Sequence, residues 1–367
     1  EDYGNPSSLH KKGYEAEGYI RQAREEIGSI LKCAPNELIF TSGGTESNNM
    51  AILGTALNTR RRGKHIITSS VEHASVSAVL QFLEEEEGYE VTRIPSDSKG
   101  VLRLDCLEDA IRPDTVLATV MMVNNEIGTI QPLKEISDMI RRKNPGVVFH
   151  VDAIQAFGKL RVRPRELGAG LLSTSSHKFH GPKGTGFLYC SSGVRLHPII
   201  FGGGQQKGMR SGTENVPGVA GMGLAAKLAY QDFEEKQKKL NSLRRYFLEG
   251  LKEIEGVSVN GWDETVDEGS VLEKRAPHIV SVSVRGVRSE VLLHALEEKG
   301  VYVSAGSACS SNHPSVSGTL KAIGLPKELL DSTVRFSFQS ETTQEELRYS
   351  LDCMKELLPV LRRFSRK

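Results

Sequence analysis

Residues 147–155 read V-V-F-H-V-D-A-I-Q, an apolar run that ends in an aspartate. Such a short apolar run is typical of a buried strand, and Asp152 lies at its carboxyl end. Ligands of parallel α/β sheets bind at the carboxyl ends of the strands. A buried carboxylate there needs a cationic partner, because otherwise it would take up a proton. Asp152 is therefore a candidate ligand-binding residue, with a helix N-cap as the alternative role.

Short apolar runs of this kind alternate with helical patterns from about residue 20 to residue 230. The predicted strands are His65–Ser70, Val116–Met121, Val147–Val151 and Gly186–Tyr189. The alternation indicates βαβ crossovers and a mostly parallel sheet. We therefore predict an α/β fold, with a large domain over residues 1–232.

The pattern changes near residue 230. Gln231–Glu255 is a charged helical pattern, and Ile279–Val284 alternates with period two, as a half-buried strand would. Thr343 and Glu346 form a capping box before a C-terminal helix. These features predict a smaller α+β domain over residues 233–367.

Composition excludes several classes of protein. The 367 residues carry 47 Lys and Arg against 46 Asp and Glu, so we expect no nucleic-acid or membrane partner. No run approaches the length of a membrane span. The chain has five scattered cysteines with no C-x-x-C pair, which argues against a disulfide framework or a zinc site, and we expect no metal. The reducing cytoplasm is the expected location.

A lysine stands in the most informative stretch, residues 173–184, S-T-S-S-H-K-F-H-G-P-K-G. Lys178 could form a Schiff base with an aldehyde, and the hydroxyls and imidazole beside it could hold a phosphate. Taken alone, the stretch fits a surface turn better. Asp152, one crossover earlier, would project from a neighbouring strand and could pair with a protonated pyridine nitrogen. Together the two residues indicate a pyridoxal-phosphate site.

Three further stretches follow predicted strands. Residues 41–49, T-S-G-G-T-E-S-N-N, place glycines and hydroxyls at a helix start, which is a natural anion site or an ordinary Gly-rich turn. His73 in V-E-H-A-S could stack on a flat ring or be a core histidine. The amide of Asn124 or Asn125 could reach a cofactor or a substrate carboxylate, or belong to a plain turn.

Cys309 lies in residues 304–315, S-A-G-S-A-C-S-S-N-H-P-S. Small polar residues and glycine predict a mobile loop, and an accessible cysteine can act as a nucleophile. A chance surface cysteine is the alternative, which the pyridoxal-phosphate constellation disfavours.

Taken in order, these stretches resemble the class V aminotransferase group and, within it, the cysteine desulfurases. The likeness covers nearly the whole chain. The motifs that carry it are G-N-P-S-S (4–8), T-S-G-G-T-E-S-N-N (41–49), E-H (72–73), V-N-N-E-I-G (123–128), V-D-A-I-Q (151–155), S-H-K-F-H-G-P-K-G (176–184), G-G-G (202–204), G-M-R-S-G-T (208–213), G-S-A-C-S-S (306–311) and V-R-F-S (334–337).

The resemblance implies a fold-type-I transferase with a seven-stranded sheet and a role for each site residue. Lys178 would carry pyridoxal 5'-phosphate, Asp152 would pair with its pyridine nitrogen, and Gln155 would bond its phenolic oxygen. His73 would stack on the ring and help to move protons. The residues expected to hold the phosphate are Gly44, Thr45, Ser175 and His177. Asn125 and Arg335 would bind the substrate carboxylate, and Thr213 would reach the site of the other subunit in a homodimer.

The implied reaction takes sulfur from L-cysteine onto Cys309 as a persulfide and leaves alanine. An iron–sulfur scaffold or a tRNA-thiolating protein would then accept the sulfur. The alternatives are a selenocysteine lyase, an aminotransferase or lyase that does not use Cys309, and a non-catalytic relative. Members of the group begin with a further strand and an Ala-Thr-Thr-type loop, and often carry another arginine near Ser340, so the contacts there are a point of difference.

Overall fold

The computed structural model describes residues 3–263, 267, 271, 273–305 and 316–364. Two compact units divide the chain. The first comprises the chain up to Ile94, Arg103–Met122 and Pro132–Gln231, and the second comprises Pro95–Leu102, Val123–Gln131 and the chain from Asp232. Within the described ranges, no helix has both the length and the apolar character that crossing a membrane requires.

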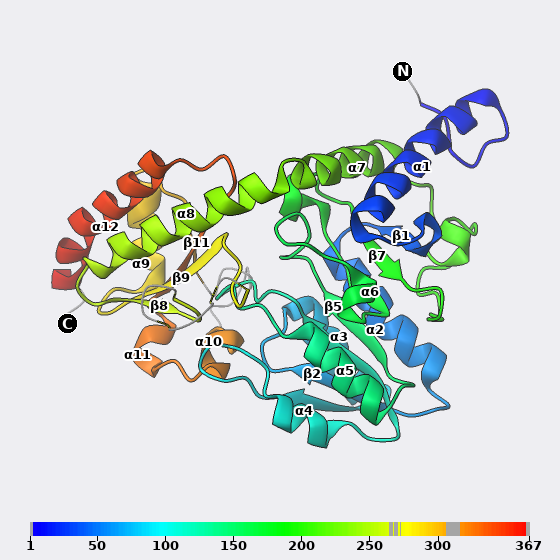
Figure 1. Ribbon diagram of the computed structural model, residues 1–367, viewed down its shortest axis with the longest axis horizontal. Coiled ribbons are helices and arrows are strands. Elements are labelled where there is room, and N and C mark those ends of the chain that lie inside the picture. Colours follow the sequence, from blue (N-terminus) through cyan, green and yellow to red (C-terminus); the bar gives the residue numbers. More distant parts are fainter. Residues whose placement is uncertain (1–2, 264–266, 268–270, 272, 306–315, 365–367) are drawn as a thin grey trace. The chain divides into compact units, whose positions relative to one another are not determined.

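A seven-stranded sheet forms the first unit, with the order β1-β7-β6-β5-β4-β2-β3 (Figure 1). Its strands are β1 (Leu38–Thr41), β2 (His65–Ser69), β3 (Glu90–Ile94), β4 (Thr115–Met121), β5 (Val148–Asp152), β6 (Leu171–Ser173) and β7 (Gly186–Cys190). Strands β3, β2, β4, β5 and β6 run parallel, and β7 is antiparallel to both of its neighbours. The predicted mostly parallel seven-stranded sheet is confirmed.

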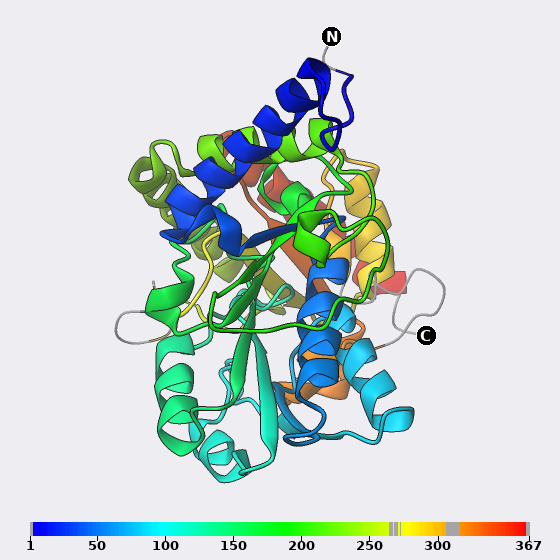
Figure 2. The same ribbon diagram turned by 90° about the vertical axis from the view of Figure 1, so that its right-hand side faces the viewer.

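Helices cover both faces of this sheet, with α2 and α3 on one side and α4 and α5 on the other (Figure 2). The helices of the unit are α1 (Lys11–Leu31), α2 (Gly44–Thr59), α3 (Ala74–Glu85), α4 (Leu104–Ala110), α5 (Leu133–Lys143), α6 (Pro164–Leu167) and α7 (Val216–Tyr230). Because the sheet is covered on both faces, β4 is buried at every position, as expected for a parallel strand.

The second unit contains a four-stranded antiparallel sheet in the order β10-β11-β9-β8. Its strands are β8 (Val257–Asn260), β9 (Ile279–Val284), β10 (Ser304–Ala305) and β11 (Thr333–Ser337). Its helices are α8 (Phe233–Lys252), α9 (Ser289–Glu297), α10 (Gly318–Ala322), α11 (Lys327–Leu330) and α12 (Gln344–Phe364). The capping box before α12 is confirmed, since Thr343 N donates to Glu346 Oε2 at 2.7 Å and Glu346 N donates to Thr343 Oγ1 at 3.2 Å.

Strand β9 corrects one expectation, because all six of its residues are buried rather than half-buried. Its valines enter the apolar core, whereas Ser281 and Ser283 face a second buried layer. There Asn260 Nδ2 donates to both serine hydroxyls, and Ser283 Oγ lies 2.7 Å from Thr333 Oγ1. The period of two is real, but the polar face is satisfied by hydrogen bonds instead of by water.

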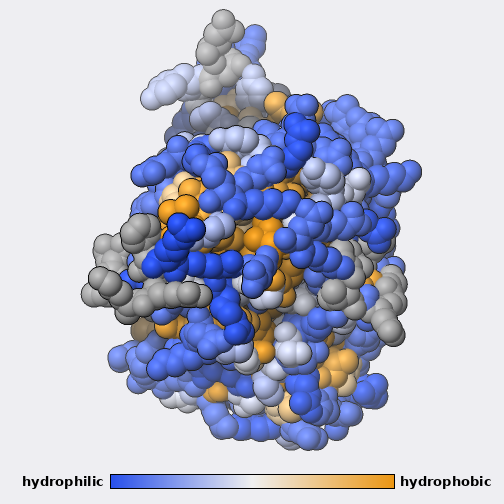
Figure 3. Space-filling view, turned by 90° about the vertical axis from the view of Figure 1, so that its left-hand side faces the viewer, coloured by the Kyte–Doolittle hydropathy of each residue, from blue (hydrophilic) through white to orange (hydrophobic). Residues whose placement is uncertain are grey.

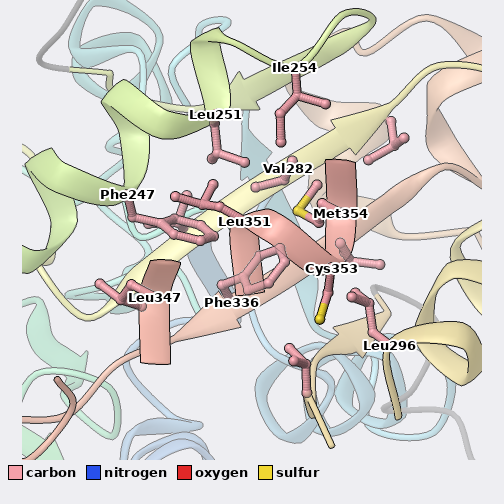
Figure 4. Packing of buried hydrophobic residues seen from close by; sticks show 14 of the residues in the cluster. Phe247, Leu251, Ile254, Val282, Leu296, Phe336, Leu347, Leu351, Cys353 and Met354 are labelled. Carbon is pink, nitrogen blue, oxygen red and sulfur yellow. The ribbon is translucent and has the colours of Figure 1, made fainter. Parts of the chain in front are cut away.

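The apolar core of the second unit lies between this sheet and helices α8, α9 and α12 (Figure 4). Phe247 is fully buried, with ring centroids 4.9 Å from Phe336 and 5.3 Å from Phe338. The unit thus has a core of its own.

The face of the molecule in Figure 3 is mostly hydrophilic, with apolar side chains gathered between charged ones.

Candidate functional site

Asp152 ends β5, as predicted, and its side chain is buried. It pairs with Ser173 at the end of β6, and Ala153 N donates to Ser173 O at 3.0 Å. Lys178 follows β6 in a short 3₁₀ turn, Ser176–Phe179. Burial raises the pKa of Asp152, while hydrogen bonds from Ile154 N and Asn48 and the nearby His73 and Lys178 oppose that rise. The structure thus brings Asp152, His73 and Lys178 together.

Asn48 connects the buried carboxylate to its surroundings. This fully buried residue of α2 donates from Nδ2 to Asp152 Oδ2 at 2.8 Å and to Ser75 Oγ at 2.9 Å. Sequence reasoning assigned no role to Asn48 or Ser75. The signal was available, because Asn48 lies one turn after Gly44 on the same face of the helix.

His73 is the N-cap of helix α3. Its Nδ1 accepts a hydrogen bond from Ser75 N at 3.1 Å and lies 2.9 Å from Ser75 Oγ. A histidine that caps a helix is fixed in orientation, since its ring nitrogen satisfies one of the free N–H groups of the first turn. The chain Asp152–Asn48–Ser75–His73 is therefore continuous.

The expected phosphate-binding residues also meet. A Cβ atom on Gly44 would lie 3.4 Å from Ser175 Cβ, so the start of α2 lies against the segment after β6. Ser175 Oγ is 2.9 Å from His177 Nδ1, and Thr45 is exposed in the first turn of α2. Burial lowers the pKa of His177, and the charges of Lys178 and Lys183 add to that effect. Free N–H groups at the start of a helix and these hydroxyls suit an anion.

Hydrogen bonds to the Glu46 carboxylate hold the loop before α2 in place. The Glu46 carboxylate accepts from Ser42 N at 3.0 Å and from Arg210 Nε at 2.8 Å. Burial acts to raise the pKa of Glu46, but the hydrogen bonds from Arg210 and Ser42 outweigh it and the pKa is lowered. Glu46 is therefore an ionised anchor of the loop.

Glu72 is a second carboxyl group near Asp152; it stands in the E-H motif, but the sequence assigned it no role. Its Oε1 accepts from Ser69 Oγ and from Met121 N, and Oε2 is buried with no hydrogen-bond partner among the described residues. Burial raises the pKa of Glu72 to about 8, and the charge of Asp152 adds to the rise. At neutral pH this group therefore holds a proton.

Two predicted residues of the first unit, Gln155 and Thr213, form no hydrogen bond with this cluster among the described residues. Gln155 is half-buried just after β5. Thr213 is exposed and lines a cavity of about 270 Å³ with Ser42 and Arg210. An exposed threonine is compatible with the predicted reach toward a second subunit.

The expected substrate-binding pair lies in the second unit. Arg335 on β11 donates from Nη1 to the carbonyl oxygen of Asn125 at 2.6 Å and from Nη2 to Ser304 Oγ at 3.1 Å. The structure therefore brings Asn125 and Arg335 into contact. Cys309 lies outside the described residues, and no group of three or more possible metal ligands occurs within them.

The donor set of the first unit fits pyridoxal phosphate. Asp152 is a buried carboxylate whose pKa a protonated pyridine nitrogen would lower, because an adjacent opposite charge favours the ionised form. Lys178 supplies an amine, and the start of α2 with Ser175 and His177 suits the phosphate.

Comparisons with known proteins agree with this geometry. A family model described as Aminotransferase class-V matches residues 1–349. The chain is 43% identical over 366 residues to "Cysteine desulfurase IscS" of Dictyoglomus turgidum, covering 100% of this chain and 90% of the relative. A solved structure titled "NIFS-LIKE PROTEIN" has a TM-score of 0.90 and 36% identity, covering 98% of this chain and 93% of that one. Another, "SspA in complex with cysteine", has a TM-score of 0.78 and 32% identity, covering 93% and 92%.

Proposed function

Because the chain belongs to the aminotransferase class-V family and, within it, to the cysteine desulfurases, we propose that it transfers sulfur from L-cysteine to Cys309 and releases L-alanine. The observation that carries the proposal is the buried Asp152 at the end of β5, beside the turn that presents Lys178. A buried carboxylate is stabilised by a cationic partner, and the protonated pyridine nitrogen of the cofactor would supply one at this strand end.

The first unit would bind and orient the cofactor. Lys178 would link to its aldehyde carbon, Asp152 to its pyridine nitrogen, and Gln155 to its phenolic oxygen. The phosphate would be held by Gly44, Thr45, Ser175 and His177, with Thr213 from a second copy of the chain. His73 would lie against the ring. When bound, pyridoxal phosphate supplies an electron sink for the carbon that loses its proton.

The second unit would bind the substrate. The guanidinium of Arg335, with the Asn125 amide, suits the carboxylate of an amino acid, because a planar fork of donors matches two oxygens. Lys178 would remove the α-proton. The Cys309 thiolate would then attack the substrate sulfur, forming an S–S bond as the C–S bond breaks. The β-carbon takes the electron pair and a proton, and a proton returns to the α-carbon, which gives alanine.

Several features of the cellular setting belong to the same proposal. Homodimerisation would let Thr213 complete the neighbouring site. An acceptor, either an iron–sulfur scaffold or a tRNA-thiolating protein, would take the sulfur from Cys309. A reducing compartment such as the cytoplasm would keep that thiol available.

Absorption and product assays test the proposal with matched lysine variants. The purified protein should show a visible absorption band with pyridoxal phosphate and form alanine from cysteine. Lys178→Ala should lose both, whereas Lys183→Ala, a change of the nearby lysine in the same stretch, should keep both. An intact band in Lys178→Ala would refute the covalent link.

Paired cysteine variants test the sulfur step separately. Cys309→Ala should keep the band and lose alanine formation from cysteine, whereas Cys190→Ala should keep both, since Cys190 lies in β7. Unchanged alanine formation by Cys309→Ala would favour a lyase that does not use this thiol. Faster turnover of selenocysteine than of cysteine would favour a selenocysteine lyase.

A further inference from the structure

We infer that His73 enters the reaction as a neutral imidazole with its proton on Nε2, and that Ser75 and Asn48 are positioning residues that hold this tautomer. This inference rests on the proposed function for its chemical meaning. The protonation state of the His73 ring can be measured without turnover. The residues that determine it all belong to the first unit: Asn48, His73, Ser75 and Asp152.

The direction of the hydrogen bonds follows from Asn48. An amide nitrogen is only a donor, and Asn48 Nδ2 has two hydrogens for two partners, Asp152 Oδ2 at 2.8 Å and Ser75 Oγ at 2.9 Å. Ser75 Oγ therefore accepts from Asn48. Its own hydroxyl hydrogen is then available to His73 Nδ1, 2.9 Å away.

A second bond fixes the role of Nδ1 independently. The backbone N–H of Ser75 donates to His73 Nδ1 at 3.1 Å, because His73 caps helix α3. A backbone N–H has only a hydrogen to offer, so Nδ1 must present a lone pair. In a neutral imidazole the proton then resides on Nε2.

The same arrangement disfavours the imidazolium. A proton on Nδ1 would face the Ser75 N–H and would break the cap. The amino end of α3, a helix of 12 residues, also carries a partial positive charge that repels a cation. The charge of Asp152 acts on the ring in the opposite direction, but Asp152 is linked to His73 only through Asn48 and Ser75, whereas the cap acts on Nδ1 directly, so the ring is neutral.

This state defines what His73 offers when the substrate arrives. Nε2 carries the proton and Nδ1 presents its lone pair to Ser75, so the ring donates a hydrogen bond from Nε2. Any proton that His73 moves during the reaction then passes through Nε2.

Asn48 extends this control to Asp152. The same amide group donates to Asp152 Oδ2 and orients the Ser75 hydroxyl, so one side chain both binds the carboxyl group of Asp152 and holds the tautomer of His73. Ile154 N also donates to Asp152, at Oδ1 and 2.9 Å.

Nitrogen NMR of the whole chain tests the inference. With ¹⁵N-histidine labelling, the His73 signals are assigned by their loss in His73→Gln, both without cofactor and with added pyridoxal phosphate. Wild type should show a protonated Nε2 and an unprotonated Nδ1 at pH 7. A protonated Nδ1, or an imidazolium, in the folded wild-type protein would overturn the inference, whatever the enzyme's activity.

Variants test the positioning residues. Ser75→Ala removes one neutral hydrogen bond to Nδ1, so the alternative tautomer or the imidazolium should become about five-fold more populated. Ser75→Thr should restore the wild-type spectrum. In the reaction, Ser75→Ala should lower kcat several-fold while KM for cysteine stays within about two-fold. An unchanged spectrum in Ser75→Ala would refute the role of Ser75.

Asn48→Asp tests whether Asn48 orients the Ser75 hydroxyl, with little change in side-chain size. The new carboxyl group would share a single proton with the adjacent Asp152, so none remains to donate to Ser75. The Ser75 hydroxyl should therefore turn toward it, and the His73 spectrum should change as in Ser75→Ala. Asn49→Ala is the control, because Asn49 donates to the carbonyl oxygens of Thr45 and Ser75 but to neither side chain of the network. Ser77→Ala is the control on α3. A folded Asn48→Asp protein with a wild-type His73 spectrum would exclude Asn48 from the network.

A normal His73 spectrum together with absent desulfurase activity would separate the two proposals. It would support the tautomer and reject the function. The reverse result would keep the function and reject the tautomer.

Discussion

Replacing Glu72 by glutamine should make the protein more stable relative to wild type as the pH rises. Burial raises the pKa of this carboxyl to about 8 from an ordinary value of 4.5. The folded protein therefore keeps a proton that the unfolded chain loses between these two values. Stability is lost as the pH rises through that window, because the unfolded state is favoured by releasing the proton.

The size of the effect follows from the width of the window. Each pH unit between the two pKa values changes the free energy of unfolding by about 1.4 kcal/mol, so the largest effect is roughly 5 kcal/mol above pH 8. Relaxation of the site and entry of water reduce it, and we expect about 2–3 kcal/mol. The amide oxygen of the Glu72→Gln variant can still accept from Ser69 Oγ and Met121 N, so the substitution removes the titration while keeping these hydrogen bonds.

Denaturant unfolding of the cofactor-free protein between pH 5 and pH 9 measures the effect. The difference in free energy of unfolding between Glu72→Gln and wild type should grow with pH. Glu86→Gln, the same change at an exposed residue at the end of α3, is the control. Parallel curves for wild type and Glu72→Gln would refute the raised pKa. Infrared spectroscopy gives a direct check, because at pH 7 wild type should show a protonated carboxyl band that the variant lacks.

Three further predictions concern the core, the substrate and the phosphate loop. Phe247→Ala should lower the free energy of unfolding by about 3–5 kcal/mol in denaturant titrations, because it removes a fully buried ring. Phe201 is 74% exposed, so Phe201→Ala should change the free energy of unfolding little. Similar losses for both variants would contradict the packing argument. Arg335→Gln should raise KM for cysteine about 10- to 100-fold in steady-state assays. Arg285 is exposed on the same unit, so Arg285→Gln should leave KM unchanged. A KM of Arg335→Gln equal to that of wild type would show that Arg335 does not bind the substrate. Glu46→Gln should weaken the affinity for pyridoxal phosphate about five-fold in equilibrium absorbance titrations, because the ion pair with Arg210 is lost. An unchanged Kd would show that this ion pair does not shape the phosphate site.

The alternation of strands and helices in the first unit could be predicted from the sequence. Buried parallel strands are short apolar runs, so His65–Ser69 and Val148–Asp152 are found within a residue of their predicted ends. The position of Asp152 followed directly, because a strand end is a feature of the local sequence.

Contacts between distant segments could not be predicted in the same way. Asn48 was visible in its motif, but its two partners lie on other elements and only the fold brings them within hydrogen-bonding distance. Burial of Ser281 and Ser283 was also hidden, because alternation of apolar and polar residues does not reveal whether the polar face meets water or Asn260. The raised pKa of Glu72 likewise depends on tertiary burial.

Two early segments of the chain, Pro95–Leu102 and Val123–Gln131, belong to the unit that the last third of the chain completes. Ile127 packs there against Leu320 and Ile323, which are synthesised nearly two hundred residues later. During translation the apolar side chains of these loops therefore stay exposed until the carboxyl-terminal segment has been synthesised and can pack against them. A fragment that begins at Asp232 would lack them, so cutting the chain at that point cannot release two intact folding units.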